Sequence, residues 1–542
     1  MIRFYRLTQW FTLLLVIAVF LAGCTSATPS ETTGQSESGQ GTDSSSGGEG
    51  GTVVIAAPTE PDTLDIHLTG WNDDANTRIY DFLLARDETG KIIPGLAESY
   101  SVSEDGKVWT FHLRKDVKFH SGAPMTAETV KSSIDRCLEI SPDKSLLGPI
   151  EKVEVPEPYT VNITLSEKFA PFLAAAADFL VVLDPTRVDK LGDKFGDDPS
   201  ATGPLIFSEK VRGASVTYKL NKEYRWSPDN AENKGAPYLD KIVFRFLKDD
   251  DTKMLEFKKG TIQIFQQVPT NFVKELENMP GVGISKTLDA GMNYLGFNNK
   301  HPFFQDVRVR QAIAMAVDRT PIVQYGMSGL AEPLYGPLPT TIPGYSQKIE
   351  DMAKEMYKTD ITKSKQLLAE AGWTDTNGDG ILEKDGEPFT TELLIEAGAE
   401  KQKIAVILQS QLKEVGIDVK ITTVADWLTI RERMDKGAHE MFLNEYGWND
   451  PDILYLLFGE GESTSLYFET DELEALMIKA RQEIDEDKRN NAYEEVDEYL
   501  VKASPWVPLF NRESVTAYRE IEGFKNSAAT GVIFQDIKLK KK

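Results

Sequence analysis

Short runs of apolar residues, some alternating with polar ones, predict strands in the first half of the chain. Asp105-Gly106 is a turn signal just before one such run, and Pro58 ends another. Four segments have this character: 52–57, 108–113, 153–165 and 216–220. We expect each of them to form strand structure.

Helical spacing of apolar residues is found mainly further along the chain. Thr126 is a candidate N-cap, and Gly416 is a candidate helix stop. Helices are predicted at 126–138, 306–318, 402–415, 472–484 and 490–501, and further strands at 417–421 and 506–510. Helices that lead into strands in this way favour an α/β fold.

The first residues have the organisation of an export signal. Arg3 and Arg6 precede an apolar run at 11–22 that is shorter than the about 20 residues a membrane-spanning helix needs. The run ends in Leu-Ala-Gly-Cys24, which resembles a bacterial lipobox. We therefore predict a lipoprotein signal peptide at 1–23, lipidation of Cys24, and a location at the cell membrane on its extracytoplasmic face. The alternative is a plain signal peptide followed by a chance cysteine.

Composition limits the possibilities for the rest of the chain. Residues 24–51 are rich in Ser, Gly and Thr and predict a flexible tether. The remaining residues are too many for one core, so two or more domains are expected. A formal charge of −25 argues against nucleic-acid binding, which needs basic patches. Lipidation of Cys24 would leave Cys137 without a disulfide partner, and we expect Cys137 to be buried as a small apolar residue.

No motif in the chain favours catalysis. The 5 histidines include no His-Glu-x-x-His pair, and the chain has neither a P-loop nor a Gly-x-Ser-x-Gly elbow. We therefore predict a protein that is not an enzyme and that has no cofactor. A secreted hydrolase with paired carboxylates stays open as an alternative, because the chain is rich in acids.

The loop that begins at Asp375 has the oxygen spacing of a calcium site. Asn377, Asp379 and Gly380 occupy the expected third, fifth and sixth places. The twelfth place, where an EF-hand has a bidentate glutamate, is Gly386. The alternative is a polar turn, and we predict no resident metal.

An ordered set of motifs identifies a family resemblance. The segment 108–122 (Val-Trp-Thr-Phe-His-Leu-Arg-Lys-Asp-Val-Lys-Phe-His-Ser-Gly) resembles the signature of the oligopeptide- and dipeptide-binding proteins of ABC importers. So do Thr202-Gly-Pro-Leu, Tyr294-Leu-Gly-Phe-Asn, 302–313 and Asp318-Arg319, in the same order. The resemblance runs from about residue 52 to 510.

The resemblance implies a two-lobed α/β fold of the periplasmic-binding-protein type II, with an additional domain in the N-terminal half and the ligand in the cleft between the lobes. Lobe one would combine 52–84, 199–290 and 504–542, the additional domain would be 85–198, and lobe two would be 291–503. Chain crossings near Ala290 and Ser504 would form a hinge for rigid-body closure.

The resemblance also implies which residues line the cleft. Trp427 and Trp448 look like the family's cleft tryptophans, and aromatic faces suit promiscuous capture. From the first lobe Glu60, Gln266 and Gln267 would contribute. The remaining predicted ligand-binding residues lie near Trp448 or on the second lobe: Tyr446, Glu445, Asp450 and Lys401. Each of these residues has a structural alternative, as part of the core or as a solvated strand end.

The chain departs from the family pattern at positions that bear on which substrate is bound. Peptide-binding members typically have an aspartate three residues beyond the second tryptophan, and this position is Pro451. Asp450 or Asp452 could substitute. Glu445 stands where some members have an arginine, and Lys401 stands where some have a histidine. Acids and lysine could bind the charged ends of a peptide.

Peptide is therefore the leading expected ligand. An oligosaccharide, an opine or a nickel chelate is the alternative within the fold, and sensing is an alternative to transport. The expected partners are ABC permease subunits with a separate ATPase and, through the lipid anchor, the membrane. We expect a monomer.

Overall fold

The computed structural model describes residues 50–69, 73–462 and 465–540. Residues from Gly47 onward form one compact unit. The predicted signal peptide, Cys24 and all but the last residues of the predicted tether lie outside the described residues. Among the described helices, none combines the length and the apolar composition of a membrane span.

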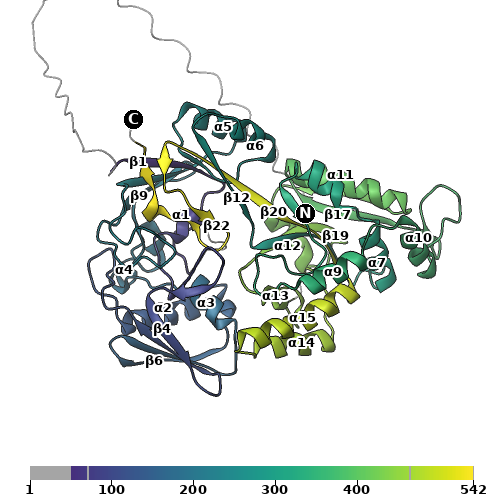
Figure 1. The fold of residues 1–542 in the computed structure, drawn as a ribbon. Coiled ribbons are helices and arrows are strands. Elements are labelled where there is room, and N and C mark those ends of the chain that lie inside the picture. The colour runs from purple at the N-terminus through teal and green to yellow at the C-terminus, as the bar shows by residue number, and fades with distance from the viewer. Residues whose placement is uncertain (1–49, 70–72, 463–464, 541–542) are drawn as a thin grey trace, which may run out of the picture. The chain divides into compact units, whose positions relative to one another are not determined.

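A 12-stranded sheet runs through this unit (Figure 1). The main path has the order β18-β17-β19-β13-β20-β11-β1-β10-β9-β8, and β12 and β14 also pair with β20. The strands are β1 (Thr52–Ala57), β8 (Leu205–Val211), β9 (Ser215–Leu220), β10 (Lys241–Phe246), β11 (Ile264–Phe265), β12 (Val282–Leu288), β13 (Gly291–Phe297), β14 (Ala331–Pro333), β17 (Thr390–Glu396), β18 (Asp418–Val424), β19 (Met441–Gly447) and β20 (Trp506–Arg519).

The part of the sheet formed by β1 and β8–β11, here called the β1 half, is buried on both faces. Val53 and Ile55 of β1 belong to one hydrophobic core, and Ala56 belongs to another. The second core includes side chains of α5 (Asp250–Lys259) and α6 (Thr270–Glu277). Burial on both faces explains why β1 is a nearly continuous apolar run.

The part formed by β13 and β17–β19, here called the β17 half, is covered in the same way. Leu295 of β13 joins one core and Tyr294 joins the other. The first core packs against α7 (Val307–Ala316), α9 (Gln347–Met356), α10 (Ile361–Glu370) and α11 (Ala399–Glu414). The second packs against α12 (Trp427–Asp435), α13 (Ile453–Phe458), α14 (Asp471–Arg481) and α15 (Glu486–Ala503).

Strand β20 connects the two halves. It is 14 residues long, and its first part pairs with β13 while its later part pairs with β11 and β12. The chain crosses a second time at Asp289 and Ala290, between β12 and β13. These two crossings lie at the centre of the sheet, where the two halves meet.

A separate 4-stranded sheet has the order β4-β5-β7-β6 and its own hydrophobic core. It consists of β4 (Ala97–Val102), β5 (Val108–Leu113), β6 (Ile150–Glu157) and β7 (Thr160–Leu165), with α2 (Ala127–Ile140), α3 (Phe172–Asp178) and the hairpin β2 (Leu84–Arg86)–β3 (Ile92–Pro94). Trp109 is 1% exposed, and its ring centroid lies 5.5 Å from that of Phe172.

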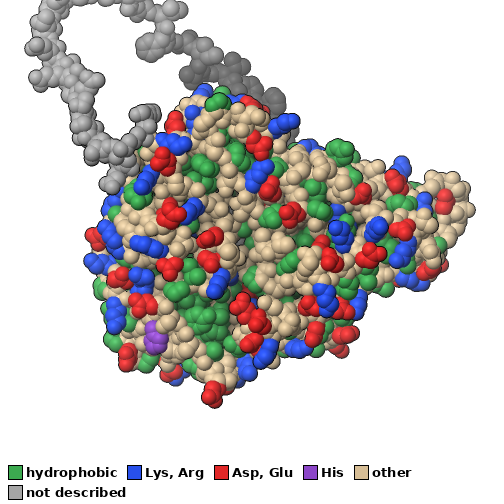
Figure 2. All heavy atoms as spheres, in the orientation of Figure 1, with side chains coloured by type: hydrophobic (Ala, Val, Ile, Leu, Met, Phe, Trp, Pro, Cys, Tyr) green, Lys and Arg blue, Asp and Glu red, His purple; other side chains and the backbone are tan. Residues whose placement is uncertain are grey.

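The remaining elements are short: α1 (Asp74–Thr77), α4 (Pro185–Leu191), α8 (Arg319–Pro321), β15 (Glu383–Lys384), β16 (Glu387–Pro388), β21 (Ile521–Glu522), β22 (Asn526–Ser527), β23 (Gly531–Val532) and β24 (Lys538–Leu539). Figure 2 shows acidic and basic side chains interspersed over the face in view, with no basic patch there.

Most predicted elements are present, with two differences. The predicted strand structure at 153–165 is a hairpin, β6–β7, because Pro158 and Tyr159 form a turn between the two strands. The predicted last strand at 506–510 extends to Arg519, because its polar residues pair with β11 and β12. Cys137 is buried as predicted, and burial raises the pKa of its thiol to about 11.

Candidate ligand-binding site

A cavity of about 1500 Å³ lies where the 4-stranded sheet, the β1 half and the β17 half meet. Its lining comes from segments that are distant in sequence, among them 57–58, 66–69, 73–86, 141–147, 177–179, 287–293, 445–449, 512–516 and 526–535. Sites for drug-sized ligands typically measure about 300–1,000 Å³. The cavity therefore has room for a ligand larger than a single amino acid.

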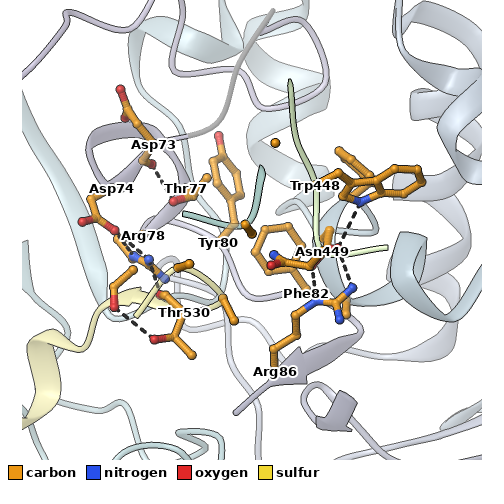
Figure 3. Close-up of a pocket in the computed structure, with 18 of the residues that line it drawn as sticks. Asp73, Asp74, Thr77, Arg78, Tyr80, Phe82, Arg86, Trp448, Asn449 and Thr530 are labelled. Carbon is orange, nitrogen blue, oxygen red and sulfur yellow. Dashed lines mark hydrogen bonds and ion pairs between the residues drawn. The ribbon is translucent and has the colours of Figure 1, made fainter. Parts of the chain in front are cut away.

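One wall of the cavity is organised by Arg78. Its guanidinium forms an ion pair with Asp74 at 2.6 Å and donates to the Thr530 carbonyl at 2.5 Å (Figure 3). The other oxygen of Asp74 accepts a hydrogen bond from Gln266 at 2.7 Å. Gly531 has a φ of 59°, which favours glycine, and a Cβ there would lie 2.2 Å from the Arg78 guanidinium, so a larger residue would displace Arg78. These contacts hold the C-terminal β22–β23 hairpin against α1.

On another wall, one carboxylate links two regions of the chain. Asp178 accepts two hydrogen bonds from Arg86, at 2.7 and 2.8 Å, and one from the Trp448 indole at 3.3 Å (Figure 3). The Trp448 ring also packs on Phe179, with centroids 5.8 Å apart. Trp448 is 9% exposed, so it presents only an edge to the cavity.

The crossing between β12 and β13 brings acidic groups to the cavity. Burial, together with the nearby charge of Glu445, raises the pKa of Asp289 to about 6, while Ser514 and Arg512 act in the opposite direction. Arg512 itself forms an ion pair with Glu400. Asp289, Glu445 and Arg512 all line the cavity.

His67 lines the cavity as a neutral hydrogen-bond donor. Its Nδ1 lies 3.0 Å from the Arg136 guanidinium, which can only donate, so the proton of the ring is on Nε2. Arg136 in turn is held by Asp65 at 2.6 Å. Burial and Arg136 lower the pKa of His67 to about 4.

Some predicted ligand-binding residues are brought together here. Trp448, Tyr446, Glu445, Gln266 and Gln267 all line the cavity. Tyr446 is 8% exposed and donates its hydroxyl hydrogen bond to the Pro337 carbonyl, so its ring is partly core. Gln267 has a φ of 48°, which turns the chain sharply at the end of β11.

The other predicted residues lie outside the lining. Asp450 is 5% exposed and accepts two hydrogen bonds from Arg489, at 2.6 and 2.9 Å. Lys401 forms an ion pair with Glu396 at 2.8 Å. Glu60 accepts from the Gly213 backbone at 2.9 Å. Trp427 begins α12 and is 36% exposed, and Arg431, one turn later, is the α12 residue in the lining.

A match to a family model over most of the chain identifies the family. The model of the bacterial extracellular solute-binding proteins, family 5 (middle part) matches residues 91–465. The chain belongs to this family. It is 30% identical over 538 residues to the oligopeptide-binding protein AppA of Bacillus subtilis (strain 168), and the match covers 95% of each chain.

Solved structures of family 5 proteins confirm the predicted two-lobed α/β fold. The structure of AppA from B. subtilis in complex with a nonapeptide has a TM-score of 0.76 at 27% identity, covering 91% of this chain and 99% of that one. The binding protein AgaA of A. tumefaciens R10, in complex with agropinic acid, has a TM-score of 0.72 at 28% identity, covering 91% and 99%. Family 5 relatives are solute-binding proteins, and the family's description places them outside the cytoplasm.

Several cavity residues of this family 5 protein were not found from the sequence. Arg78, Arg86, Asp178 and Asp289 belong to segments without a local motif, and only the fold brings them to one cavity. His67 follows Asp65 closely in the chain, but its partner Arg136 is on α2. No local pattern could have revealed that pairing.

The predicted calcium loop contains a group of acids. Carboxylate oxygens of Asp375, Asp379 and Glu383 lie within 4.8 Å of one another. Glu383, which the sequence analysis did not single out, is buried and accepts hydrogen bonds from Thr376 and Asn377 within the same loop. These contacts also suit a polar turn, so calcium binding stays an untested alternative.

Proposed function

We propose that this family 5 protein captures short peptides outside the cytoplasm and delivers them to an ABC permease with a separate ATPase. The observation that carries the proposal is the cavity of about 1500 Å³, lined by Trp448, Gln266 and other groups from distant segments. A lining that mixes apolar and polar groups suits peptides of varied sequence. The similarity to an oligopeptide-binding protein over 95% of both chains supports the same ligand class.

We further propose the domain boundaries that the resemblance implies. Lobe one is 52–84, 199–290 and 504–542, the additional domain is 85–198, and lobe two is 291–503. The crossings at Asp289–Ala290 and along β20 support a hinge at these positions. Ligand would then close the lobes around it, and the scattering profile of the protein should change when saturating ligand is added.

The leading experiment is native mass spectrometry of the chain without residues 1–24, purified from cells grown in rich medium. Binding proteins with slow ligand release retain their ligand, so a ladder of added masses that match short peptides is expected. A single adduct with the mass of a sugar, an opine or a metal chelate would overturn peptide capture. Incubation with the identified peptide should return it intact, whereas a hydrolase would deplete it.

Membrane attachment is proposed separately. The basic residues, apolar run and Leu-Ala-Gly-Cys24 ending support lipidation of Cys24 and anchoring on the extracytoplasmic face. Metabolic labelling with a fatty acid should mark the wild-type protein and leave Cys24→Ser unlabelled. Label retained in the variant would overturn the anchor and leave peptide capture unaffected.

An opine or a related small solute is the second candidate. The position of the family's typical peptide-binding aspartate is Pro451, and the neighbouring Asp450 already pairs with Arg489. The similarity to a protein in complex with agropinic acid favours this alternative. The same mass spectrum distinguishes it, because an opine gives one mass rather than a ladder.

A further inference from the structure

The charged side chains around the cavity are unequally distributed. Carboxylates clearly outnumber cationic groups in the lining, and within the described residues the lining contains no lysine. Its cationic side chains are Arg78, Arg86, Arg431 and Arg512. His67 does not add to them, because burial and Arg136 lower its pKa to about 4. The cavity therefore has an excess of negative charge at neutral pH.

Three of these arginines already have carboxylate partners within the protein. Arg78 pairs with Asp74 at 2.6 Å, Arg86 pairs with Asp178 at 2.7 Å, and Arg512 pairs with Glu400. Arg431 acts electrostatically on Asp143 across the cavity. An anionic ligand would have to compete with these acids for Arg78, Arg86 and Arg512.

Two carboxylates at the crossing between the halves differ from the others. Neither Asp289 nor Glu445 forms an ion pair with any side chain in the described parts of the chain. Asp289 is partly buried, with the Ser514 hydroxyl as its nearest polar support, and Glu445 is open to the cavity. Burial is the main cause of the raised pKa of Asp289, and the negative charge of nearby Glu445 adds to it, so the two acids repel each other. A cation placed between them would remove this repulsion and form charge-assisted hydrogen bonds.

We propose that this cavity selects peptides that carry a lysine or arginine side chain, and that Asp289 and Glu445 bind that side chain. The inference rests on the proposed function, since it names the class of peptide captured. A peptide with free ends and neutral side chains has no net charge, so its ends alone leave the excess negative charge of the cavity uncompensated. One lysine or arginine side chain adds a positive charge that offsets part of this excess.

The test uses ligand-free protein without residues 1–24 and calorimetric titration with alanine pentapeptides. One set contains a single lysine at each position in turn, and matched sets contain methionine or glutamate instead. We expect the best lysine peptide to bind at least about tenfold more tightly than its methionine counterpart, and the glutamate peptide to bind most weakly. In Asp289→Asn/Glu445→Gln the preference for lysine over methionine should fall below about threefold.

Asp189→Asn/Glu387→Gln is the matched control. It makes the same change in net charge at two exposed acids outside the lining, so it should keep the wild-type preference. Loss of the preference in the control would show a long-range charge effect and overturn the role of Asp289 and Glu445. If the wild-type protein binds lysine, methionine and glutamate peptides equally well, the proposed selectivity is wrong and the proposed peptide function stands. If none of the peptides binds, both the selectivity and the proposed peptide function are wrong.

Discussion

Two sets of acids near the cavity have opposite environments. Asp450 and Asp452, here called the inward acids, follow Trp448 in the chain but point into the β17 half, where Arg489 and Arg481 hold them at 2.6 and 2.9 Å. Asp289 and Glu445, the cavity acids, lack such partners among the described residues and line the cavity. A carboxylate held by an arginine cannot bind a ligand cation without breaking its ion pair. Proximity in sequence to Trp448 therefore does not indicate a role in binding.

The largest expected effect comes from breaking an inward pair. Asp450→Ala leaves Arg489 buried without its partner, so the free energy of unfolding should fall by about 3–5 kcal/mol. Urea unfolding of ligand-free protein measures this. Replacing both residues, Asp450→Leu with Arg489→Met, should recover most of the loss. Glu445→Ala should change stability by less than about 0.5 kcal/mol, and an equal loss in the two alanine variants would erase the distinction between the two sets of acids.

An intermediate effect is expected for Asp178, which both pairs with an arginine and lines the cavity. Asp178→Asn keeps the shape but removes the charge that holds Arg86, so stability should fall by about 1.5–3 kcal/mol. Because Trp448 also donates to Asp178, the affinity for the co-purified ligand should fall as well. Urea unfolding and calorimetric titration of the same variant measure stability and affinity. A loss of stability with unaltered affinity would show that Asp178 stabilises the fold without contributing to binding.

A smaller effect of opposite sign is expected at Asp497, a buried acid that forms no ion pair with an arginine among the described residues. It is 1% exposed on α15, one of its oxygens has no hydrogen-bond partner among the described residues, and burial raises its pKa well above the usual value. Its contribution to stability is present at low pH and is lost as the pH rises through its folded-state pKa. Asp497→Asn should therefore stabilise the protein by about 1 kcal/mol at pH 8, with less gain near pH 4.

The exposed neighbour Glu498, which pairs with Lys502 one turn away, provides the control for this prediction. Glu498→Gln should shift the melting temperature little at any pH. A pH-independent effect of Asp497→Asn would show that Asp497 is not the titrating group.

The smallest expected effect is a pH dependence of binding. Asp289 is faced by Glu445 from β19 and by Arg512 and Ser514 from β20, and its pKa is about 6. Protonation below pH 6 removes the charge that a lysine side chain would bind, so affinity for a lysine peptide should fall by about threefold to tenfold from pH 7.5 to pH 5. Calorimetric titration should show a flatter profile for Asp289→Asn, and an unchanged profile would exclude Asp289 as the responsive group.

The fold was more predictable from the sequence than the site. Segments such as 52–57 and 402–415 have clear periodicity, and the ordered motifs identified the family. Trp448 and Glu445, which line the cavity, were predicted from the family resemblance, although neither lies in one of these motifs. Asp450 was assigned to the ligand in the sequence, and the structure places it with Arg489, 39 residues away. Partners at that separation depend on packing between α15 and the preceding loop, which no local pattern encodes.

The position of β20, after all the strands with which it pairs, has a consequence for folding during synthesis. Strands β11, β12 and β13 are complete by residue 297, yet all three pair with β20, which begins only at residue 506. Pairings between segments so distant in sequence form slowly, because the loop they close must first be ordered. The central sheet therefore remains incomplete until the chain has been synthesised as far as Arg519.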